Sequence, residues 1–208
     1  MTIRTRTSIV AAFALFTIVV APAANAQVER AEEQSPPAMP GAVPLERVIA
    51  AVAKRTGKQF IVDPRVRGQV TVVGQEATSI DYATLLSILQ VHGFATVEQG
   101  GSVRVIPDAN IRQQALPLVS GKESYADGEY VNKIIMLKNV AAAQLVPILR
   151  PLLPQHAHLV AMPCKNALLV TDVFASVKRI EQIARALDVG EAYTPPACSG
   201  DWPPKQGS

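Results

Sequence analysis

The stretch 58–73, KQFIVDPRVRGQVTVV, constrains the fold of this chain more than any other. Two runs rich in β-branched residues, 60–62 and 70–73, predict short strands. Between them, Pro64 fixes its own φ and lacks an N–H, which ends the first strand, and Gly68 can take a positive φ as the chain becomes extended again. We therefore expect two short strands joined by a constrained turn, around which a small core packs.

The N-terminus has the features of an export signal. Arg4 and Arg6 precede an apolar run over residues 9–21, and the small residues of Ala24-Asn25-Ala26 form a signal-peptidase site. The run is shorter than the ~20 residues that a spanning helix needs. We expect residues 1–26 to be removed after Ala26 and the mature chain to be exported, with no spanning segment.

The charge balance gives little indication of a nucleic-acid partner. Removal of residues 1–26 takes away two of the 20 basic residues and none of the 17 acidic ones, which leaves a net charge of +1. A nucleic-acid site needs a concentrated basic surface, and none is visible in the mature sequence. We therefore expect no nucleic acid among the partners.

The two cysteines, Cys164 and Cys198, lie far apart in the sequence. Neither belongs to a C-x-x-C pair or to a zinc-binding spacing. An exported compartment permits disulfides, so an intramolecular bridge, two free thiols and an intermolecular bridge all remain open.

The first folded module is expected over residues 44–107, after a charged, Pro-containing tether at 27–43 that is expected to be disordered. Apolar residues at helical spacing follow Pro44, and Gly57 ends that helix. A second helix begins after Asp81, which can cap it, and ends at Gly93. Runs 94–97 and 103–106 predict a hairpin. This order favours an α+β fold, with two helices on one face of a small mixed sheet.

A linker at 108–128 separates this module from a second one at 129–190, and a Pro-rich tail at 191–208 is expected to be disordered. The second module has the order βαββα. Asn139 is expected to cap its first helix and Asp172 its second. The apolar faces of the two helices are expected at Ala141, Leu145, Ile148, Leu149 and Leu152 and at Val173, Val177, Ile180, Ala184 and Leu187.

No arrangement of residues indicates an enzyme or a cofactor site. The glycine-rich, nucleophile-elbow and zinc-helix motifs are missing from the sequence. His156, His158 and Cys164 could converge on a metal ion, but they lack a fourth ligand, so we expect no metal site. His92 beside Gly93 is expected to cap a helix C-terminus.

Two other features have a simple structural interpretation. Lys58, Arg65 and Arg67 could attract an acidic partner, but a solvated turn explains them better. Trp202 lies in the tail, outside both modules, as an incidental residue or as an aromatic anchor.

Two segments resemble modules of a known family. Segment 45–106, with the pattern D-P-x-V-x-G-x-V-T-V, resembles the most N-terminal periplasmic module of type II secretion secretins. Segment 131–189, with N-x-L-L-V-T-D, resembles the next module of these proteins, a KH-like unit. The resemblance implies periplasmic modules that form rings, hence a possible homo-oligomer, and that dock inner-membrane or outer-membrane proteins of a secretion machine.

The sequence departs from the family in two places. The extra strand that usually leads into the first helix falls at 39–43, which reads as a poor strand, so a sheet edge is expected to be open or differently covered. The sequence also lacks the pore-forming region of a secretin, so we expect that it does not form the pore itself.

The resemblance also implies a partner site. In the family, the strand after the D-P turn contributes to docking an inner-membrane partner, and the matching residues are Gln69, Val70, Thr71, Val72 and Val73. We therefore expect a non-enzymatic periplasmic interaction component of a secretin-dependent machine. The alternative is a periplasmic sensing module of the kind that contacts an anti-sigma regulator.

Overall fold

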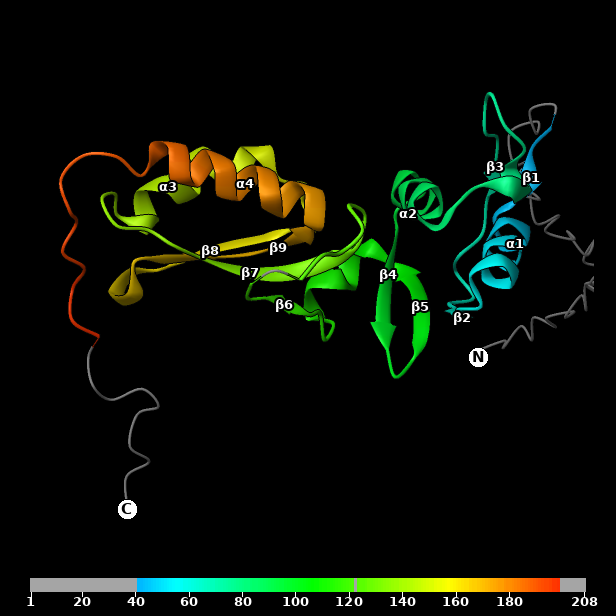
Figure 1. The fold of residues 1–208 in the computed structure, drawn as a ribbon, viewed down its shortest axis with the longest axis horizontal. Coiled ribbons are helices and arrows are strands. Elements are labelled where there is room, and N and C mark those ends of the chain that lie inside the picture. The colour runs from blue at the N-terminus through cyan, green and yellow to red at the C-terminus, as the bar shows by residue number, and fades with distance from the viewer. Residues whose placement is uncertain (1–40, 122, 199–208) are drawn as a thin grey trace, which may run out of the picture. The chain divides into compact units, whose positions relative to one another are not determined.

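The computed structural model describes residues 41–121 and 123–198 (Figure 1). The expected signal peptide with its cleavage site at Ala26, most of the tether and Trp202 lie outside these residues. The described residues carry nine strands and four α-helices, with short 3-10 helices between them. We call residues 43–107 the N-terminal lobe and residues 118–198 the C-terminal lobe.

The N-terminal lobe contains two helices and two separate sheets. Its larger sheet has the strand order β2-β5-β4, in which β2 is parallel to β5 and β4 is antiparallel to it. The second sheet contains only β1 and β3, which are antiparallel. The bounds are β1 Val43–Pro44, α1 Leu45–Thr56, β2 Gln59–Val62, β3 Gln69–Val70, α2 Tyr82–Val91, β4 Phe94–Gln99 and β5 Ser102–Pro107.

The strands on either side of the D-P turn do not pair with each other. Strand β2 pairs with β5, Phe60 opposite Val103, whereas β3 pairs with β1, Val70 opposite Val43. The second strand is also shorter than expected, because β3 ends at Val70. The turn therefore carries the chain from one sheet to the other, and the core that the helices bury is shared between two sheets.

Several local signals in this lobe are confirmed. Asp81 Oδ1 accepts a hydrogen bond from Thr84 N at 2.8 Å, which satisfies an orphan donor at the start of α2. Gly57 ends α1 in the left-handed conformation with φ 69°. The hairpin turns at Gly100 and Gly101, which both have a positive φ that glycine adopts readily. His92 occupies the C-cap position of α2, where its backbone N–H donates to Ile88 O and Leu89 O, so a specific role of its imidazole stays a prediction.

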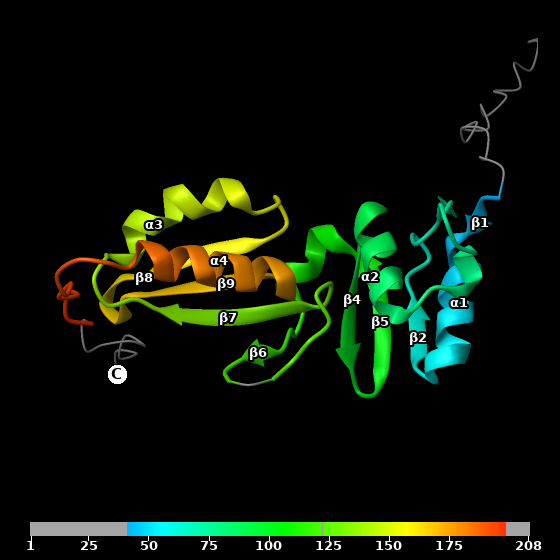
Figure 2. The ribbon, with the colours of Figure 1, turned by 45° about the horizontal axis from the view of Figure 1, so that its top comes forward.

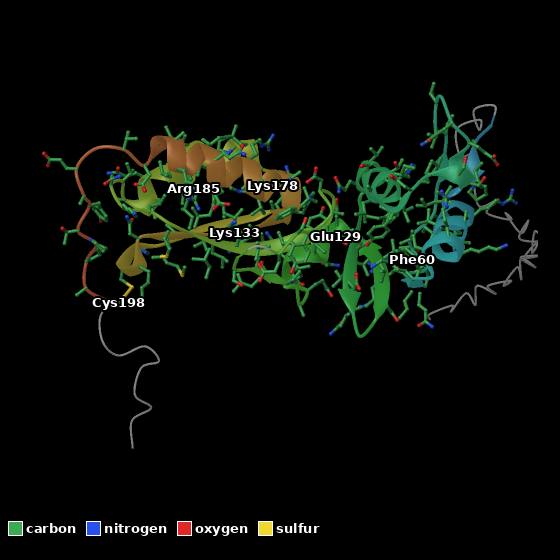
Figure 3. The ribbon with its side chains drawn as sticks, viewed as in Figure 1. Phe60, Glu129, Lys133, Lys178, Arg185 and Cys198 are labelled. Carbon is green, nitrogen blue, oxygen red and sulfur yellow. A yellow bond between two sulfur atoms is a disulfide. The ribbon has the colours of Figure 1, made fainter. Side chains whose placement is uncertain are left out.

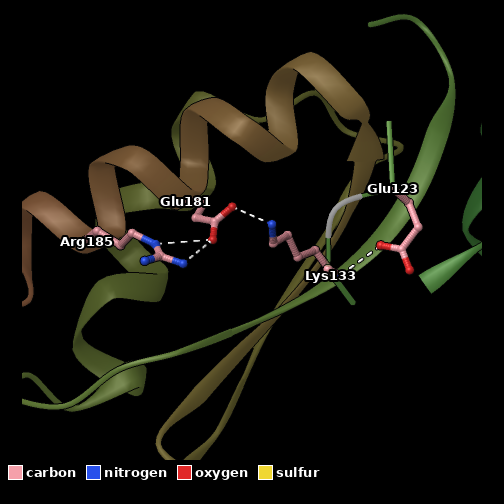
Figure 4. Close-up of polar contacts among 5 residues, drawn as sticks. Glu123, Lys133, Glu181 and Arg185 are labelled. Carbon is pink, nitrogen blue, oxygen red and sulfur yellow. Dashed lines mark hydrogen bonds and ion pairs between the residues drawn. The ribbon is translucent and has the colours of Figure 1, made fainter. Parts of the chain in front are cut away.

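The C-terminal lobe is a four-stranded sheet with the order β6-β7-β9-β8. Helices α3 and α4 lie together on one face of this sheet, as Figures 1 and 2 show. Lys133 on β7 connects the two layers through an ion pair with Glu181 of α4 at 2.6 Å, and Glu181 also binds Arg185 (Figure 4). The bounds are β6 Leu118–Val119, β7 Tyr130–Met136, α3 Ala142–Leu149, β8 His158–Met162, β9 Ala167–Val173 and α4 Phe174–Leu187.

Neither helix of this lobe is capped as the sequence indicates. The side chain of Asn139 binds the Asp188 carbonyl instead of the start of α3, and Asp172 lies within β9. The first N–H groups of α4 donate to backbone carbonyls, Phe174 N to Glu129 O at 2.8 Å and Ala175 N to Asp127 O at 3.1 Å. Caps supplied from distant segments leave no local pattern, which is why the sequence misplaces them.

The predicted apolar faces of these helices are partly wrong. Leu145, Leu149, Val177, Ile180 and Ala184 are buried as expected. However, Ile148 is 55% exposed, Leu152 is 44% exposed and Leu187 is 38% exposed. Val173 precedes α4 as its N-cap residue. Ile148 and Leu152 therefore contribute to the surface rather than to the core.

The segment expected as a linker is built into the fold. Residues 108–113 form a 3-10 helix with Ile111 fully buried, and β6 extends the C-terminal sheet in parallel with β7. Further along, Gly128 contacts α2: its carbonyl accepts a hydrogen bond from Gln90 at 3.1 Å, and a Cβ placed there would lie 2.7 Å from Leu86 Cβ. Segment 108–128, which was expected to be a free linker, thus contacts α2 of the N-terminal lobe and β7 of the C-terminal lobe.

Cys164 and Cys198 form a disulfide, which decides between the three possibilities that the sequence leaves open. The backbone N–H of Tyr193 also donates to Lys138 O at 2.9 Å. Residues 191–198, expected to be disordered, are therefore attached to the C-terminal lobe at two points. Residues 199–208 lie outside the described part of the chain. In the part that the structure covers, no helix combines the length and the apolar character needed to cross a bilayer.

Candidate partner-binding surface

The five residues singled out by the resemblance, 69–73, alternate between the core and the solvent. Val70 is only 3% exposed and belongs to the core around α1, and Val72 packs against the same core. Gln69 and Thr71 are exposed, and Val73 is 93% exposed. The segment therefore divides into an inner pair that holds it in place and an outer set of three that can meet another protein.

The register of β3 determines which backbone groups are free. Leu45 N donates to Gly68 O at 3.0 Å, and Val43 lies opposite Val70, so these positions face β1. In an antiparallel pair the intervening residues direct their N–H and C=O groups to the other side. Gln69 and Thr71 consequently present their backbone away from β1, and no strand among residues 41–121 and 123–198 pairs with that side of β3.

The expectation of a poor lead-in strand and of an open or differently covered sheet edge is corrected in part. Val43–Pro44 forms β1 and covers one side of β3, although only for two residues. Pro44 supplies no N–H and then serves as the N-cap residue of α1, which explains why the strand ends there. Among the described residues, the edge of β3 that faces away from β1 is therefore the unpaired one.

The basic residues near this segment are engaged by neighbours. Arg65 binds Asp63 through two side-chain hydrogen bonds of 2.9 Å, and these bonds lower the pKa of Asp63 to about 2. Arg67 donates to Pro64 O at 3.1 Å. Lys58 pairs with Glu98 of β4 at 2.8 Å, and its ammonium group lies over the ring of Tyr82. The structure thus agrees with a solvated, internally paired turn.

The histidines and the cysteine considered for metal binding do not converge. Cys164 is engaged in the disulfide, and His158 is exposed at the start of β8. His156 lies between Tyr130 Oη at 3.1 Å and Asp108 Oδ2 at 3.4 Å. Within the described ranges, no group of three or more possible ligands is close enough to hold a metal ion.

A cavity of about 560 Å³ was not anticipated from the sequence. It is lined by residues from α2 and β4, from the segment 115–117 and from the approach to β7, including Tyr82, Tyr125 and Glu129. Burial raises the pKa of the Tyr82 phenol, and the nearby Glu129 carboxylate adds to this effect. No sequence pattern indicates this cavity, because five of its eleven lining residues belong to the segment interpreted as a free linker.

Two family matches cover most of the two lobes. Residues 42–105 match the family described as the GspD-like N0 domain. Residues 132–192 match the family described as the bacterial type II/III secretion system short domain. The boundaries of both matches fall close to those of the resemblance noted in the sequence.

Individual relatives agree with these matches. The chain is 37% identical over 146 residues to secretin XcpQ of Pseudomonas aeruginosa and 33% identical over 149 residues to secretin GspD of Vibrio cholerae, in each case over 69% of this chain. It spans only 21% and 22% of the length of these two proteins.

One solved structure supports the fold as well. It is the Klebsiella pneumoniae type II secretion outer-membrane complex of PulD, PulS and the PulC HR domain, with 32% identity, a TM-score of 0.59, and coverage of 71% of this chain and 26% of that one. The chain therefore contains a GspD-like N0 domain and a bacterial type II/III secretion system short domain, the N-terminal modules that it shares with type II secretion secretins.

Proposed function

We propose that this protein is a non-enzymatic periplasmic interaction component of a type II or related secretin-dependent machine. Its role is to dock an envelope partner through the free edge of β3. The proposal includes the division of the chain into two modules, 44–107 and 129–190. Each of these segments overlaps one family match, which supports the division. The matched families and relatives give no support to the anti-sigma alternative.

The observation that carries the proposal is the combination of exposure and register in segment 69–73. Val70 holds the segment on the core, while the backbone of Gln69 and Thr71 faces away from β1. A partner strand added at this edge would gain main-chain hydrogen bonds, and its side chains would meet Val73. Edge addition gives affinity without needing a deep pocket, which suits a surface of this kind.

The relatives suggest which partner to test first. The similar Klebsiella complex contains the PulC HR domain, so the counterpart of that domain in this protein's own organism is the first partner to test. The relationship to the secretins also suggests that these modules form oligomers. Measuring the molar mass of the chain in solution tests oligomerisation separately from partner docking.

Site-specific photo-crosslinking in intact cells tests the docking surface. A photoreactive amino acid at Val73 is expected to crosslink a secretion-machine protein. The matched control position is Ile61, which is 57% exposed on the edge strand β2 of the other sheet. Crosslinks from Ile61 but not from Val73 would move the site to the other sheet, and no envelope partner from either position would overturn the proposal.

A further inference from the structure

Strand β4 lies at the end of the larger sheet, in the order β2-β5-β4, so β5 pairs with only one of its two edges. The other edge has no strand partner among residues 41–121 and 123–198. Free strand edges are templates for an additional strand, and proteins normally cover or interrupt them. The backbone groups on this edge and their surroundings therefore determine what β4 can bind.

The hydrogen bonds of the neighbouring strand identify the free backbone groups of β4. Asp63 N donates to Val105 O at 3.0 Å, so Val105 directs its backbone groups to β2 rather than to β4. Thr96 lies opposite Val105 in the antiparallel pair of β4 and β5. Opposed residues in such a pair alternate between bonding to each other and facing outward. Thr96 therefore presents its N–H and C=O at the free edge, and so does Glu98, two residues further along β4.

This free edge borders the cavity of about 560 Å³. Thr96, Val97 and Glu98 all line the cavity, although successive side chains of a strand point to opposite faces of the sheet. A cavity touches both faces of a strand when it wraps around the edge. Within the described ranges, no backbone hydrogen bond from a segment other than β5 reaches Thr96 or Glu98. The cavity thus contains main-chain donors and acceptors that an added strand can pair with.

The two walls of the cavity differ in chemistry. On the Thr96 face, the Tyr82 phenol lies near the side chains of Thr96 and Glu129. Glu129 belongs to the segment that leads into β7 and is labelled in Figure 3. On the opposite face, Leu116 packs with Val97 in one apolar cluster. An extended peptide at this edge would point alternate side chains to a polar, aromatic wall and to an apolar wall.

The charge of the lining favours a basic ligand. The lining includes Glu98 and Glu129 and no basic residue. Lys58 compensates Glu98 at 2.8 Å, and its ammonium group lies 5.2 Å from the centre of the Tyr82 ring. Glu129 takes part in none of the ion pairs among the described residues, and its Oε2 accepts a hydrogen bond from Ala126 N at 2.9 Å. An uncompensated carboxylate beside tyrosine rings is a favourable site for a guanidinium group.

We propose that this cavity binds an extended, basic peptide segment of a partner protein, which adds to β4 as a strand and places an arginine side chain on Glu129. Aliphatic side chains of the same peptide pack against Leu116 on the other wall. The main-chain hydrogen bonds supply affinity, and the alternation of basic and aliphatic residues supplies specificity. The site lies on a different strand and a different sheet from segment 69–73, so it does not depend on the proposed docking function.

Synthetic peptides added to the full chain test the proposal directly. The probe is a fluorescein-labelled hexapeptide of alternating arginine and valine, and fluorescence anisotropy is expected to show saturable binding. Replacement of its arginines by glutamate removes the charge complementarity, and N-methylation of its backbone amides removes the strand pairing. Each change is expected to weaken binding about tenfold or more, because each removes charge-assisted or main-chain hydrogen bonds.

Variants of the protein locate the peptide on the lining. Glu129→Gln keeps an acceptor for Ala126 N but loses the charge, so it is expected to bind the arginine peptide about tenfold more weakly. Glu123→Gln is the matched control, because Glu123 is an exposed residue of the same segment that does not line the cavity. Its affinity is expected to equal that of the wild type.

A second pair of variants tests the edge of β4. Glu98→Pro removes an N–H group that faces the cavity, whereas Glu98→Ala keeps it, and both lose the carboxylate. Proline is tolerated on an edge strand where the N–H faces away from the neighbouring strand. Strand pairing predicts several-fold weaker peptide binding for Glu98→Pro than for Glu98→Ala. Far-UV circular dichroism verifies that both variants are folded.

Four results would overturn the proposal. They are the absence of saturable binding, equal affinity for the arginine and glutamate peptides, equal affinity for the plain and N-methylated peptides, and equal affinity of Glu129→Gln and Glu123→Gln. Equal binding by folded Glu98→Pro and Glu98→Ala would also contradict pairing with β4. If Glu98→Pro does not fold, the N-methylated peptide still decides whether the ligand binds as a strand.

Discussion

Asn166 Oδ1 accepts a hydrogen bond from the backbone N–H of Ala142 at 2.8 Å and so caps helix α3 from a segment 24 residues away. Its side-chain amide donates to Leu137 O at 3.2 Å and Val140 O at 3.0 Å. Asn166 is 3% exposed and adopts a left-handed conformation with φ 46°. One buried side chain thus joins the end of β7, the start of α3 and the turn before β9.

Asn166→Ala is expected to lower the free energy of unfolding by about 3 kcal/mol, because a buried cap and two further hydrogen bonds are lost at a position with positive φ. Urea denaturation measures the change. Asn166→Gly separates the two causes, since glycine tolerates the left-handed backbone but also lacks the cap. Equal stability of wild type and Asn166→Gly would contradict the capping role.

Gly128→Ala is expected to destabilise the protein by about 1–3 kcal/mol, because the new methyl group would lie 2.7 Å from Leu86 Cβ and 2.8 Å from Gln90 Nε2. Thermal unfolding provides the measurement. Gly121→Ala is the matched control, since its nearest neighbour, Glu123 Oε2, is 3.7 Å away. An unchanged melting temperature for Gly128→Ala would show that segment 127–129 does not pack on α2 in solution.

Asp188 accepts hydrogen bonds from three consecutive backbone N–H groups, those of Lys138, Asn139 and Val140. Burial alone would raise the pKa of Asp188, but these donors outweigh it and lower the pKa below its ordinary value. The folded state then binds fewer protons than the unfolded state, so this contribution to stability is present at neutral pH and is lost as the pH falls through the depressed pKa.

Asp188→Ala is accordingly expected to cost about 2 kcal/mol at pH 7 and much less in strong acid. Denaturation curves at several pH values give the comparison, with the exposed Glu191→Ala as control. A loss that stays the same at every pH would attribute the effect to packing instead of to the charged form of Asp188.

Asp172 shows the opposite behaviour. It is 1% exposed, and neither carboxylate oxygen has a hydrogen-bond partner of good geometry among the described residues. Burial raises the pKa of Asp172 despite the nearby amide of Val173 and hydroxyl of Ser176. The folded state therefore binds more protons, so the stability that depends on this group decreases as the pH rises from the ordinary to the raised pKa.

Asp172→Asn is expected to raise the stability by about 1 kcal/mol at pH 7, because it removes the burial cost of a charge. The advantage should vanish in acid, where the wild-type carboxyl is protonated. Melting temperatures of both proteins across the acidic range provide the test. A variant less stable than wild type at neutral pH would indicate that the carboxylate has a stabilising partner.

Local sequence signals predicted the helices and strands better than the strand pairing and the long-range contacts between them. Gly57, Asp81 and the Gly100–Gly101 turn act within a few residues, so their roles were readable from the sequence. The pairing of β3 with β1 was not readable, because two-residue strands have almost no pattern. The caps at Asn166 and Asp188 act across 24 to 50 residues, and such contacts appear only in the fold.

The resemblance located the candidate site, and the structure separated its core-facing residues from its exposed ones. The sequence pattern around Thr71 identified the segment. Its alternation between core and solvent became visible only in the structure, where Val70 is buried. The linker was misinterpreted for a physical reason: 3-10 helices and a two-residue strand lack the periodicity that identifies longer elements. The cavity beside Tyr82 was missed along with it.

The affinity of the counterpart HR domain for Thr71 variants tests the central claim most directly. Thr71→Pro removes the outward-facing backbone N–H, whereas Thr71→Ala keeps it, so edge pairing predicts at least tenfold weaker binding for the proline variant, about 1.4 kcal/mol, and nearly wild-type binding for the alanine variant. Val73→Asp serves as a second probe if the proline variant does not fold. Wild-type affinity in folded Thr71→Pro and Val73→Asp would contradict the account.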